Sequence, residues 1–147
     1  MPEILIREMQ PADISEIMEI ERKSFSTPWS ELSFLNEMYD LHSISKVALL
    51  NNNITGYICV KQKSDEGHIL NLAVHPDFRR HGYATTLVGK VLDELRKRGC
   101  KYLYLEVRVS NLGARKFYER IGFKVVGVRR KYYTSPDEDA VVMMLVL

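Results

Sequence analysis

The chain has 147 residues, of which 46% are hydrophobic and 27% charged, and this is the composition of a soluble globular protein long enough to bury a core. Its formal net charge of +2, with no Lys/Arg run longer than residues 129–131, gives no support for nucleic-acid binding. Cys59 and Cys100 lack metal-ligand spacing, and no apolar stretch reaches signal-peptide or membrane-spanning length, so we expect a cytoplasmic protein that binds neither a metal nor a membrane.

The N-terminal segment predicts one strand followed by two helices. Residues 5–9 read as the strand, and apolar residues at helical spacing from position 14 begin the first helix. Ser30 can cap the second helix, which contains Leu32, Leu35, Met38 and Tyr39. The connection between the helices carries Phe25, Pro28 and Trp29, which form either a ligand wall or a hydrophobic staple that packs the loop onto the sheet.

The next segment predicts a β-hairpin and a third antiparallel strand. Residues 46–50 and 54–60 are rich in β-forming residues, and the three asparagines at 51–53 tolerate the positive φ of a tight turn. A second turn at 64–67 leads into the apolar run 69–74. We therefore expect three consecutive antiparallel strands before the longest helix.

Residues 69–99 read as a strand–loop–helix unit. From residue 84 the apolar residues follow the i, i+3, i+4, i+7 spacing of a helix packed on a sheet, and Gly99 is placed to end it in the left-handed conformation. The helix N-terminus leaves main-chain N–H groups without partners, and the basic residues Arg79, Arg80 and His81 precede it with Gly82. A diphosphate fits such an end, although an ordinary basic helix start has the same residues. The loop lacks both the Walker A ending and the three glycines of a dinucleotide fingerprint.

The second half of the chain predicts a strand, a short helix and two final strands. Residues 102–107 form the strand, and a right-handed crossover makes it parallel to 69–74. Gly122 closes the helix, and the strands 124–133 and 140–146 follow. The fold class is therefore α+β, with a mixed, mostly antiparallel sheet of seven strands and four flanking helices. Its one parallel pair splays at the carboxyl ends, where ligands enter such sheets.

Two residues of the second half are candidates for proton transfer. Glu106 lies deep in the strand 102–107, where a carboxylate needs a partner, a water or a task, unless it points to solvent at the strand end. Tyr118 lies on the apolar stripe of the short helix, where a core tyrosine is the usual explanation. Spacing alone leaves both alternatives open.

Several motifs together resemble one family. The spacing Arg79-x-x-Gly82-x-Ala84 resembles the pyrophosphate-binding signature of the Gcn5-related N-acetyltransferases, and residues 105–123 resemble the second half of their core. Residues 25–30 and 129–140 are similar to the RimI type, the N-terminal alanine acetyltransferases of a small-subunit ribosomal protein. The motifs span nearly the whole chain, so the resemblance implies one acetyltransferase domain over residues 1–147. Two departures are Arg79 where the RimI type often has Gln, and Ala84 where it often has Gly.

The resemblance also implies roles for individual residues. Glu106 would be the general base and Tyr118 the general acid. The coenzyme would be held by Leu72, Ala73 and Val74 on the strand, by Arg79, Arg80, His81, Gly82, Tyr83, Ala84 and Thr85 at the helix start, and by Asn111. The acceptor groove would be lined by Phe25, Trp29, Tyr132 and Tyr133.

The implied reaction is direct transfer of an acetyl group from acetyl-CoA to a protein N-terminus, with a ribosomal protein as one candidate target. An α-amino group with a pKa of about 8 needs only a modest base, so a carboxylate is sufficient. Three alternatives remain: a broad-specificity archaeal type of N-terminal acetyltransferase, an acetyltransferase of lysine or small amines, and a regulatory module that binds acyl-CoA without turnover. Bulky aromatic residues on both sides of the groove would admit a chain terminus more easily than an internal lysine.

Overall fold

A computed structural model describes residues 4–147 of the protein. The strands are β1 (Leu5–Glu8), β2 (Ser43–Leu50), β3 (Asn53–Lys63), β4 (Glu66–Val74), β5 (Tyr102–Arg108), β6 (Lys124–Tyr133) and β7 (Glu138–Val146). The helices are α1 (Ile14–Ser24), α2 (Glu31–Tyr39), α3 (Tyr83–Lys97) and α4 (Leu112–Ile121), and two short 3-10 helices lie at Pro11–Asp13 and Pro76–Phe78. Every expected strand and helix is present, in the expected order.

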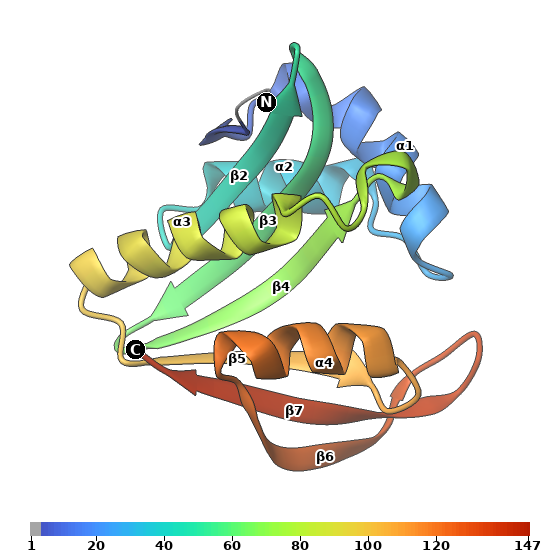
Figure 1. The fold of residues 1–147 in the computed structure, drawn as a ribbon, viewed down its shortest axis with the longest axis vertical. Helices are drawn as coiled ribbons and strands as arrows, with labels where there is room; N and C mark the ends of the chain where they lie inside the picture. Colours follow the sequence, from blue (N-terminus) through green and yellow to red (C-terminus); the bar gives the residue numbers. More distant parts are fainter. Residues whose placement is uncertain (1–3) are drawn as a thin grey trace.

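The strands form one seven-stranded sheet in the order β1-β2-β3-β4-β5-β7-β6. All neighbours are antiparallel except β4 and β5, which are parallel. The helix α3 supplies the crossover between these two strands and lies with α4 on the near side of the sheet in Figure 1, while α1 and α2 lie behind it. The expected α+β fold class and its single parallel pair are confirmed.

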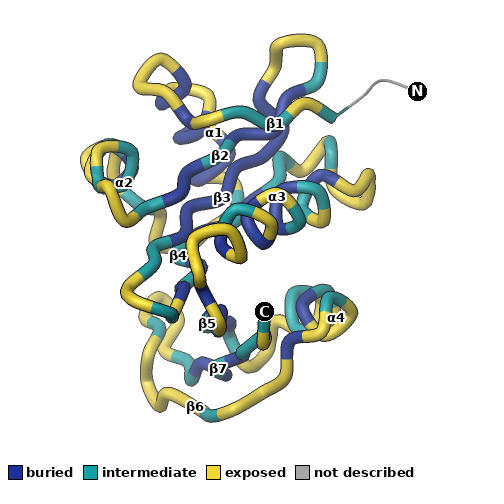
Figure 2. Tube along the Cα trace, turned by 90° about the vertical axis from the view of Figure 1, so that its left-hand side faces the viewer, coloured by how far each residue is buried: buried dark blue, intermediate teal, exposed yellow. Residues whose placement is uncertain are grey.

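Alternating side chains of β3 divide the core between the two faces of the sheet. Ile58 and Val60 pack in the cluster that contains the apolar face of α3, whereas Tyr57 and Cys59 pack in the cluster that contains α1 and α2. The middle of β3 is therefore buried on both faces of the sheet. The burial colours of Figure 2 show these central strands in dark blue and β6 exposed along the outer edge of the sheet.

The parallel pairing between β4 and β5 is short. It joins Glu66 to Tyr102, Gly67 to Leu103 and His68 to Tyr104, and no further pair of the two strands is in register among residues 4–147. Beyond His68 the strands diverge toward their carboxyl ends, as Figure 1 shows. The sheet therefore opens between β4 and β5 at the place where the sequence predicts a ligand site.

Local backbone geometry explains two of the predicted turns, and a third differs from its expected length. Asn51 and Asn52 adopt φ of 50° and 67°, so the asparagines supply the left-handed conformation that the β2–β3 turn requires. Gly99 adopts φ of 77° just after α3 and ends it as expected. The turn before β4 is shorter than expected, because Glu66 and Gly67 already pair with β3.

The helix α2 packs on the sheet through Phe34, Leu35 and Met38. Leu32 and Tyr39 are exposed, whereas Phe34 is completely buried and packs against the sheet. In this helix of nine residues, the apolar residues on one face pack against the sheet, while Leu32 and Tyr39 point to solvent on the other. Among residues 4–147, no helix is long and apolar enough to cross a membrane, and no three His, Cys, Asp or Glu side chains are grouped as metal ligands.

Candidate active site

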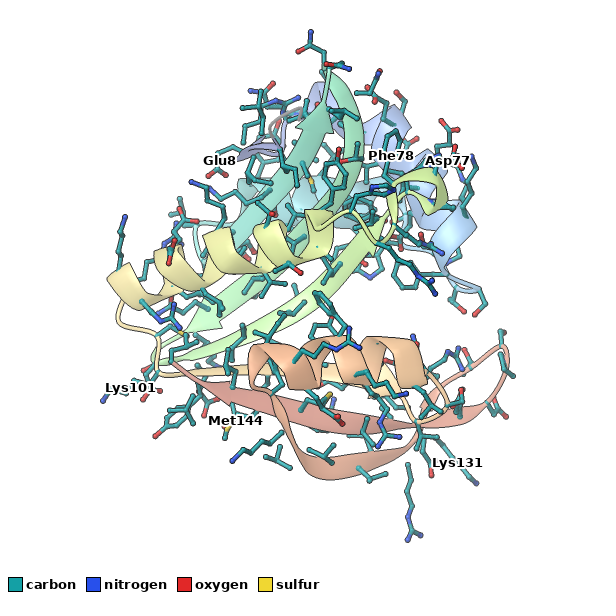
Figure 3. All side chains as sticks on the ribbon, in the orientation of Figure 1. Glu8, Asp77, Phe78, Lys101, Lys131 and Met144 are labelled. Carbon is teal, nitrogen blue, oxygen red and sulfur yellow. The ribbon has the colours of Figure 1, made fainter. Side chains whose placement is uncertain are left out.

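The opening between β4 and β5 contains a cavity of about 580 Å³. Its walls come from the α1–α2 loop, β4, β5, α4 and the end of β6. Figure 3 shows the surroundings of this opening, with Asp77 and Phe78 beyond the carboxyl end of β4 and Lys131 on β6 at the opposite side. Residues far apart in the sequence therefore surround one space.

Glu106 points into this cavity from β5. Its Oε1 lies 2.6 Å from Nε2 of His68 on β4 and accepts a hydrogen bond from the Tyr132 hydroxyl at 3.3 Å. Burial raises the pKa of the Glu106 carboxyl, but the hydrogen bond and charge of His68 outweigh it, and the pKa lies below its usual value. Glu106 is therefore ionised near neutral pH and can accept a proton.

Tyr118 reaches the same cavity from α4. It is almost completely buried, and its ring makes edge contacts with Phe117 and Phe123 at centroid distances of 5.1 and 5.4 Å. Burial, and then the charge of Tyr133, raise the pKa of the Tyr118 hydroxyl well above its usual value. This hydroxyl is therefore protonated at neutral pH and can act as a donor in the cavity.

One wall of the cavity is the loop between α1 and α2. Phe25 and Trp29 both line the cavity, and the Trp29 ring packs on Phe34 with centroids 5.0 Å apart. The main-chain N–H of Trp29 donates a hydrogen bond to Oε2 of Glu21 at 2.9 Å. Both interpretations of this loop, as a ligand wall and as a segment packed onto the core, apply to Trp29, because its ring packs on Phe34 and also lines the cavity.

The opposite wall is the end of β6. Tyr132 and Tyr133 line the cavity and contact each other edge to face at 4.9 Å. The Arg108 guanidinium lies 4.5 Å from the centre of the Tyr133 ring and donates to the main-chain oxygens of Thr134 and Pro136. Arg108 therefore holds the β6–β7 turn, and the two tyrosines face the α1–α2 loop across the cavity.

Strand register determines which main-chain groups face the opening. The N–H of His75 donates to the oxygen of Thr55, so His75, and with it Ala73, directs its main-chain groups toward β3. Leu72 and Val74 must then direct theirs toward β5, which has already diverged. Of the three residues expected to offer main-chain groups, Leu72 and Val74 face the opening, whereas Ala73 bonds within the sheet.

The start of α3 has the features expected for an anion site. Gly82 adopts φ of 86° as the N-cap, and a Cβ added there would meet nothing within 4 Å. The N–H of Thr86 is the first to bond within the helix, to the oxygen of Gly82, so the N–H groups of Tyr83, Ala84 and Thr85 are left for a ligand. A diphosphate fits this open, donor-rich helix end.

The basic residues before α3 do not all point alike. Arg79 donates to the oxygen of Val74 at 3.0 Å and to the Ser24 hydroxyl at 3.4 Å, so its guanidinium ties the loop to β4 and α1. Arg80 and His81 are exposed beside the helix start. Arg80 adopts φ of 66°, a conformation that few non-glycine residues adopt.

Asn111 caps α4 at the far side of the cavity. Its Oδ1 accepts the N–H of Ala114 at 3.1 Å, and the residue lines the cavity. The capping bond uses the oxygen, so the amide nitrogen is the atom with hydrogens left to donate. Asn111 can therefore hold the helix and contact a ligand together.

Comparison with protein families agrees with this geometry. A family model described as "Acetyltransferase (GNAT) family" matches residues 14–123, which is most of the chain. The chain belongs to this family. It is an acetyl-CoA-dependent N-acetyltransferase, and the cavity between β4 and β5 is its candidate active site.

Curated relatives of this acetyltransferase have nearly the same length. The [ribosomal protein bS18]-alanine N-acetyltransferase of Escherichia coli is 34% identical over 142 residues, which cover 95% of each chain. The protein of the same name from Haemophilus ducreyi is 36% identical over 146 residues, covering 97% of this chain and all of the relative. The similarity therefore includes both walls of the cavity.

Solved structures agree with the sequence comparison. The crystal structure of the Escherichia coli ribosomal-protein-alanine N-acetyltransferase superposes with a TM-score of 0.90 at 33% identity, covering 98% of this chain and 94% of the other. Ard1 from Thermoplasma volcanium superposes with a TM-score of 0.92 at 26% identity, covering 98% and 97%. The acetyltransferase thus shares its complete fold with both.

The structure brings the predicted catalytic and acceptor residues of this acetyltransferase into one cavity, while the residues at the start of α3 lie beyond it along the same opening. Sequence reasoning missed four polar residues that shape the site: Glu21, His68, Asn71 and Arg108. Asn71 and His68 are polar residues within an apolar strand, and that signal could have identified them. Glu21 and Arg108 gave no such signal, because charged residues are common on helices and at strand ends.

Proposed function

We propose that this acetyltransferase acetylates the α-amine of protein N-termini, and that residues 1–147 form one catalytic domain. The observation that carries the proposal is the placement of Glu106 between two aromatic walls, at the base of the opening between β4 and β5. The similarity to ribosomal-protein-alanine N-acetyltransferases extends over 95% of the chain and supports a ribosomal protein as substrate. We place the reaction in the cytoplasm, where newly made N-termini meet acetyl-CoA.

The residues for holding acetyl-CoA are proposed from the free main-chain groups. The N–H groups of Tyr83, Ala84 and Thr85, with Arg80 and His81 beside them, would bind the diphosphate. The main-chain groups of Leu72 and the N–H of Val74 would bind the pantetheine arm and polarise the acetyl carbonyl, while the Val74 oxygen already accepts from Arg79. Acetyl-CoA supplies the acetyl group already activated as a thioester, so the protein needs no nucleophile of its own.

Glu106 would remove the proton from the ammonium of the acceptor. Its lowered pKa keeps it ionised, and the hydrogen bond from His68 stabilises that ionised carboxylate. An N-terminal ammonium has a pKa of about 8, so transfer to a carboxylate is uphill by a few units and is completed as the amine attacks. His68 and the Tyr132 hydroxyl both bond to Oε1, so Oε2 would take the proton, and His68 would orient the carboxylate toward the acceptor.

Tyr118 would donate its proton to the departing sulfur. Its raised pKa keeps the hydroxyl protonated, so it can donate to the sulfur as negative charge develops there when the carbon–sulfur bond breaks. Because Glu106 comes from β5 and Tyr118 from α4, the base and the acid approach the reacting atoms from different elements. This separation suits direct transfer in a ternary complex, in which positioning provides much of the acceleration.

The two aromatic walls favour a chain terminus over an internal lysine. Trp29 on one side and Tyr132 and Tyr133 on the other narrow the groove. The main chain on both sides of an internal lysine would have to pass between these rings, whereas a terminus enters from one side. The tyrosine hydroxyls can also bind the first peptide bonds, which a polyamine does not have.

A peptide panel tests this proposal. Acetyl-CoA is offered with peptides that differ in their first two residues, with N-terminally blocked versions that contain lysine, and with spermidine, and mass spectrometry locates the acetyl group. We expect modification at the α-amine and inert blocked peptides. Acetyl groups on lysine side chains, or rapid turnover of spermidine, would replace the proposal with the small-amine alternative, and hydrolysis or binding without transfer would favour the regulatory module.

A further inference from the structure

The buried carboxylate of Glu21 lies at the base of the α1–α2 loop. Glu21 is 1% exposed and lines the active-site cavity, although the proposed chemistry does not use it. Oε1 accepts hydrogen bonds from the Tyr57 hydroxyl at 2.5 Å and from Nδ2 of Asn71 at 2.8 Å, and Oε2 accepts the N–H of Trp29 at 2.9 Å. No ion pair of Glu21 is present within residues 4–147, so these donors stabilise the charge.

The three donors belong to three different elements. Tyr57 is on β3, Asn71 on β4 and Trp29 in the loop, so the carboxylate joins α1 to the sheet and the loop to both. Aromatic contacts connect the same elements, because the Phe34 ring packs on the rings of Trp29 and Tyr57 at centroid distances of 5.0 and 5.5 Å. The position of the Trp29 main chain is therefore fixed by a buried charge, and its ring is fixed by the core.

We propose that Glu21 is a positioning residue that sets the acceptor side of the active site by fixing Trp29. This inference rests on the proposed function in one respect, which is that the acceptor is a peptide that contacts the wall formed by Trp29. The partner atom is a main-chain N–H, so any residue at position 29 would be held in the same way. Glu21 then determines where the wall stands, and Trp29 determines its shape.

Two substitutions of graded severity test the proposal. Glu21→Met keeps the length of the side chain but leaves the Trp29 N–H and the Asn71 amide without an acceptor. Glu21→Gln keeps one acceptor oxygen and should fall between Glu21→Met and the wild type. We expect the peptide KM to rise about tenfold in Glu21→Met and about threefold in Glu21→Gln, as expected for the loss of hydrogen bonds to a buried acceptor, with the acetyl-CoA KM unchanged.

The fluorescence of Trp29 provides a second measurement that needs no substrate. Trp29 is the only tryptophan in the chain, so its emission reports the loop alone. In Glu21→Met the emission maximum should move to longer wavelength and acrylamide should quench it more strongly. The matched control is Glu37→Met. Glu37 accepts a hydrogen bond from the Ser43 hydroxyl and forms an ion pair with Lys61, with 3.2 Å between Oε1 and Nζ, and it does not line the cavity. Its loss should alter neither the Trp29 emission nor the peptide KM.

The outcomes separate this proposal from the proposed function. Unchanged Trp29 emission and peptide KM in Glu21→Met, or an equal rise in the KM of peptide and acetyl-CoA, would overturn the role of Glu21. If Glu21→Met does not fold, Glu21→Gln decides by the same two measurements. If the wild-type protein acetylates no peptide, the proposed function fails, and the quenching of Trp29 still decides whether Glu21 fixes the loop.

Discussion

Gly82 offers a sharp test of where the coenzyme diphosphate binds. Gly82→Ala adds one methyl group at the N-cap of α3, where φ is 86° and a Cβ would meet no protein atom within 4 Å. The substitution therefore causes no clash in the free protein. Its cost to folding is the strain of a non-glycine residue in the left-handed region, about 1 kcal/mol, which corresponds to a fall in Tm of about 3 °C for a domain of this size.

The effect on acetyl-CoA should be much larger than the effect on stability. In the proposed site, the added Cβ would lie where phosphate oxygens approach the N–H groups of Tyr83 and Ala84, which no main-chain oxygen of the helix accepts. Weakening one or two charge-assisted hydrogen bonds of about 1.5 kcal/mol each raises the acetyl-CoA KM about 10- to 100-fold, while the peptide KM stays within twofold. Steady-state kinetics with each substrate varied at saturation of the other measure both values.

Gly99→Ala is the matched control at the other end of the same helix. Gly99 also has a positive φ, 77°, and open space around an added Cβ, so the strain is the same while the diphosphate site is distant. We expect a similar fall in Tm and unchanged kinetics. If Gly99→Ala raised the acetyl-CoA KM as much as Gly82→Ala, or if Gly82→Ala raised the peptide KM equally, the diphosphate would not bind at this helix end.

Three further perturbations follow from the described contacts. Tyr118→Phe should lower kcat about a hundredfold with the acetyl-CoA KM unchanged, because it removes the proposed acid, and stopped-time assays with purified protein measure the loss. His68→Gln should raise the pKa of Glu106, since His68 lowers it, and the acid limb of the kcat/KM profile should therefore move to higher pH; an unmoved limb would argue against Glu106 as the base. Asp13→Asn should cost about 2 kcal/mol at pH 7 in urea unfolding, because Asp13 accepts two hydrogen bonds from Arg7. Burial raises the pKa of Asp13, but the hydrogen bonds from Arg7 outweigh burial, and the pKa in the folded protein is lowered. The stabilisation by Asp13 is therefore complete above the unfolded pKa of about 4. The difference in stability between Asp13→Asn and the wild type should shrink as the pH falls through the folded pKa.

Local signals in the sequence were sufficient for most of the fold. Apolar periodicity identified α3, and the asparagines at 51–53 and Gly99 marked turns that do adopt positive φ. These signals work because helix spacing, turn conformation and chain reversal depend on neighbouring residues. The position of β7 between β5 and β6 depends on distant pairing, and nothing local in the sequence specified it.

Only those site residues that belong to sequence motifs could be predicted. Glu106 and Tyr118 belong to recognisable motifs, whereas the hydrogen bond between His68 and Glu106 joins residues 38 positions apart. Glu21 looked like any charged residue on a helix, and only its burial by three elements makes it distinctive. Long-range contacts of this kind become visible once the sheet has brought the segments together.

The short parallel seam between β4 and β5 makes the active site sensitive to the place where the two halves of the sheet join. The residues before the seam carry the α1–α2 loop, and those after it carry the β6–β7 turn, so the angle between two half-sheets sets the width of the groove. From Gly67 to Val74 is a lever arm of about 20 Å at about 3.3 Å per residue, and a rotation of about 3° moves its end by about 1 Å. A Cβ at Gly67 would lie 3.1 Å from the Leu103 side chain and 3.2 Å from the Cys100 side chain, so a methyl group there would require these neighbours to give way by a few tenths of an ångström. Catalytic geometry in this protein is thus partly encoded at the vertex of the sheet, where a misplacement of about 1 Å at the reacting atoms can cost about a hundredfold in rate.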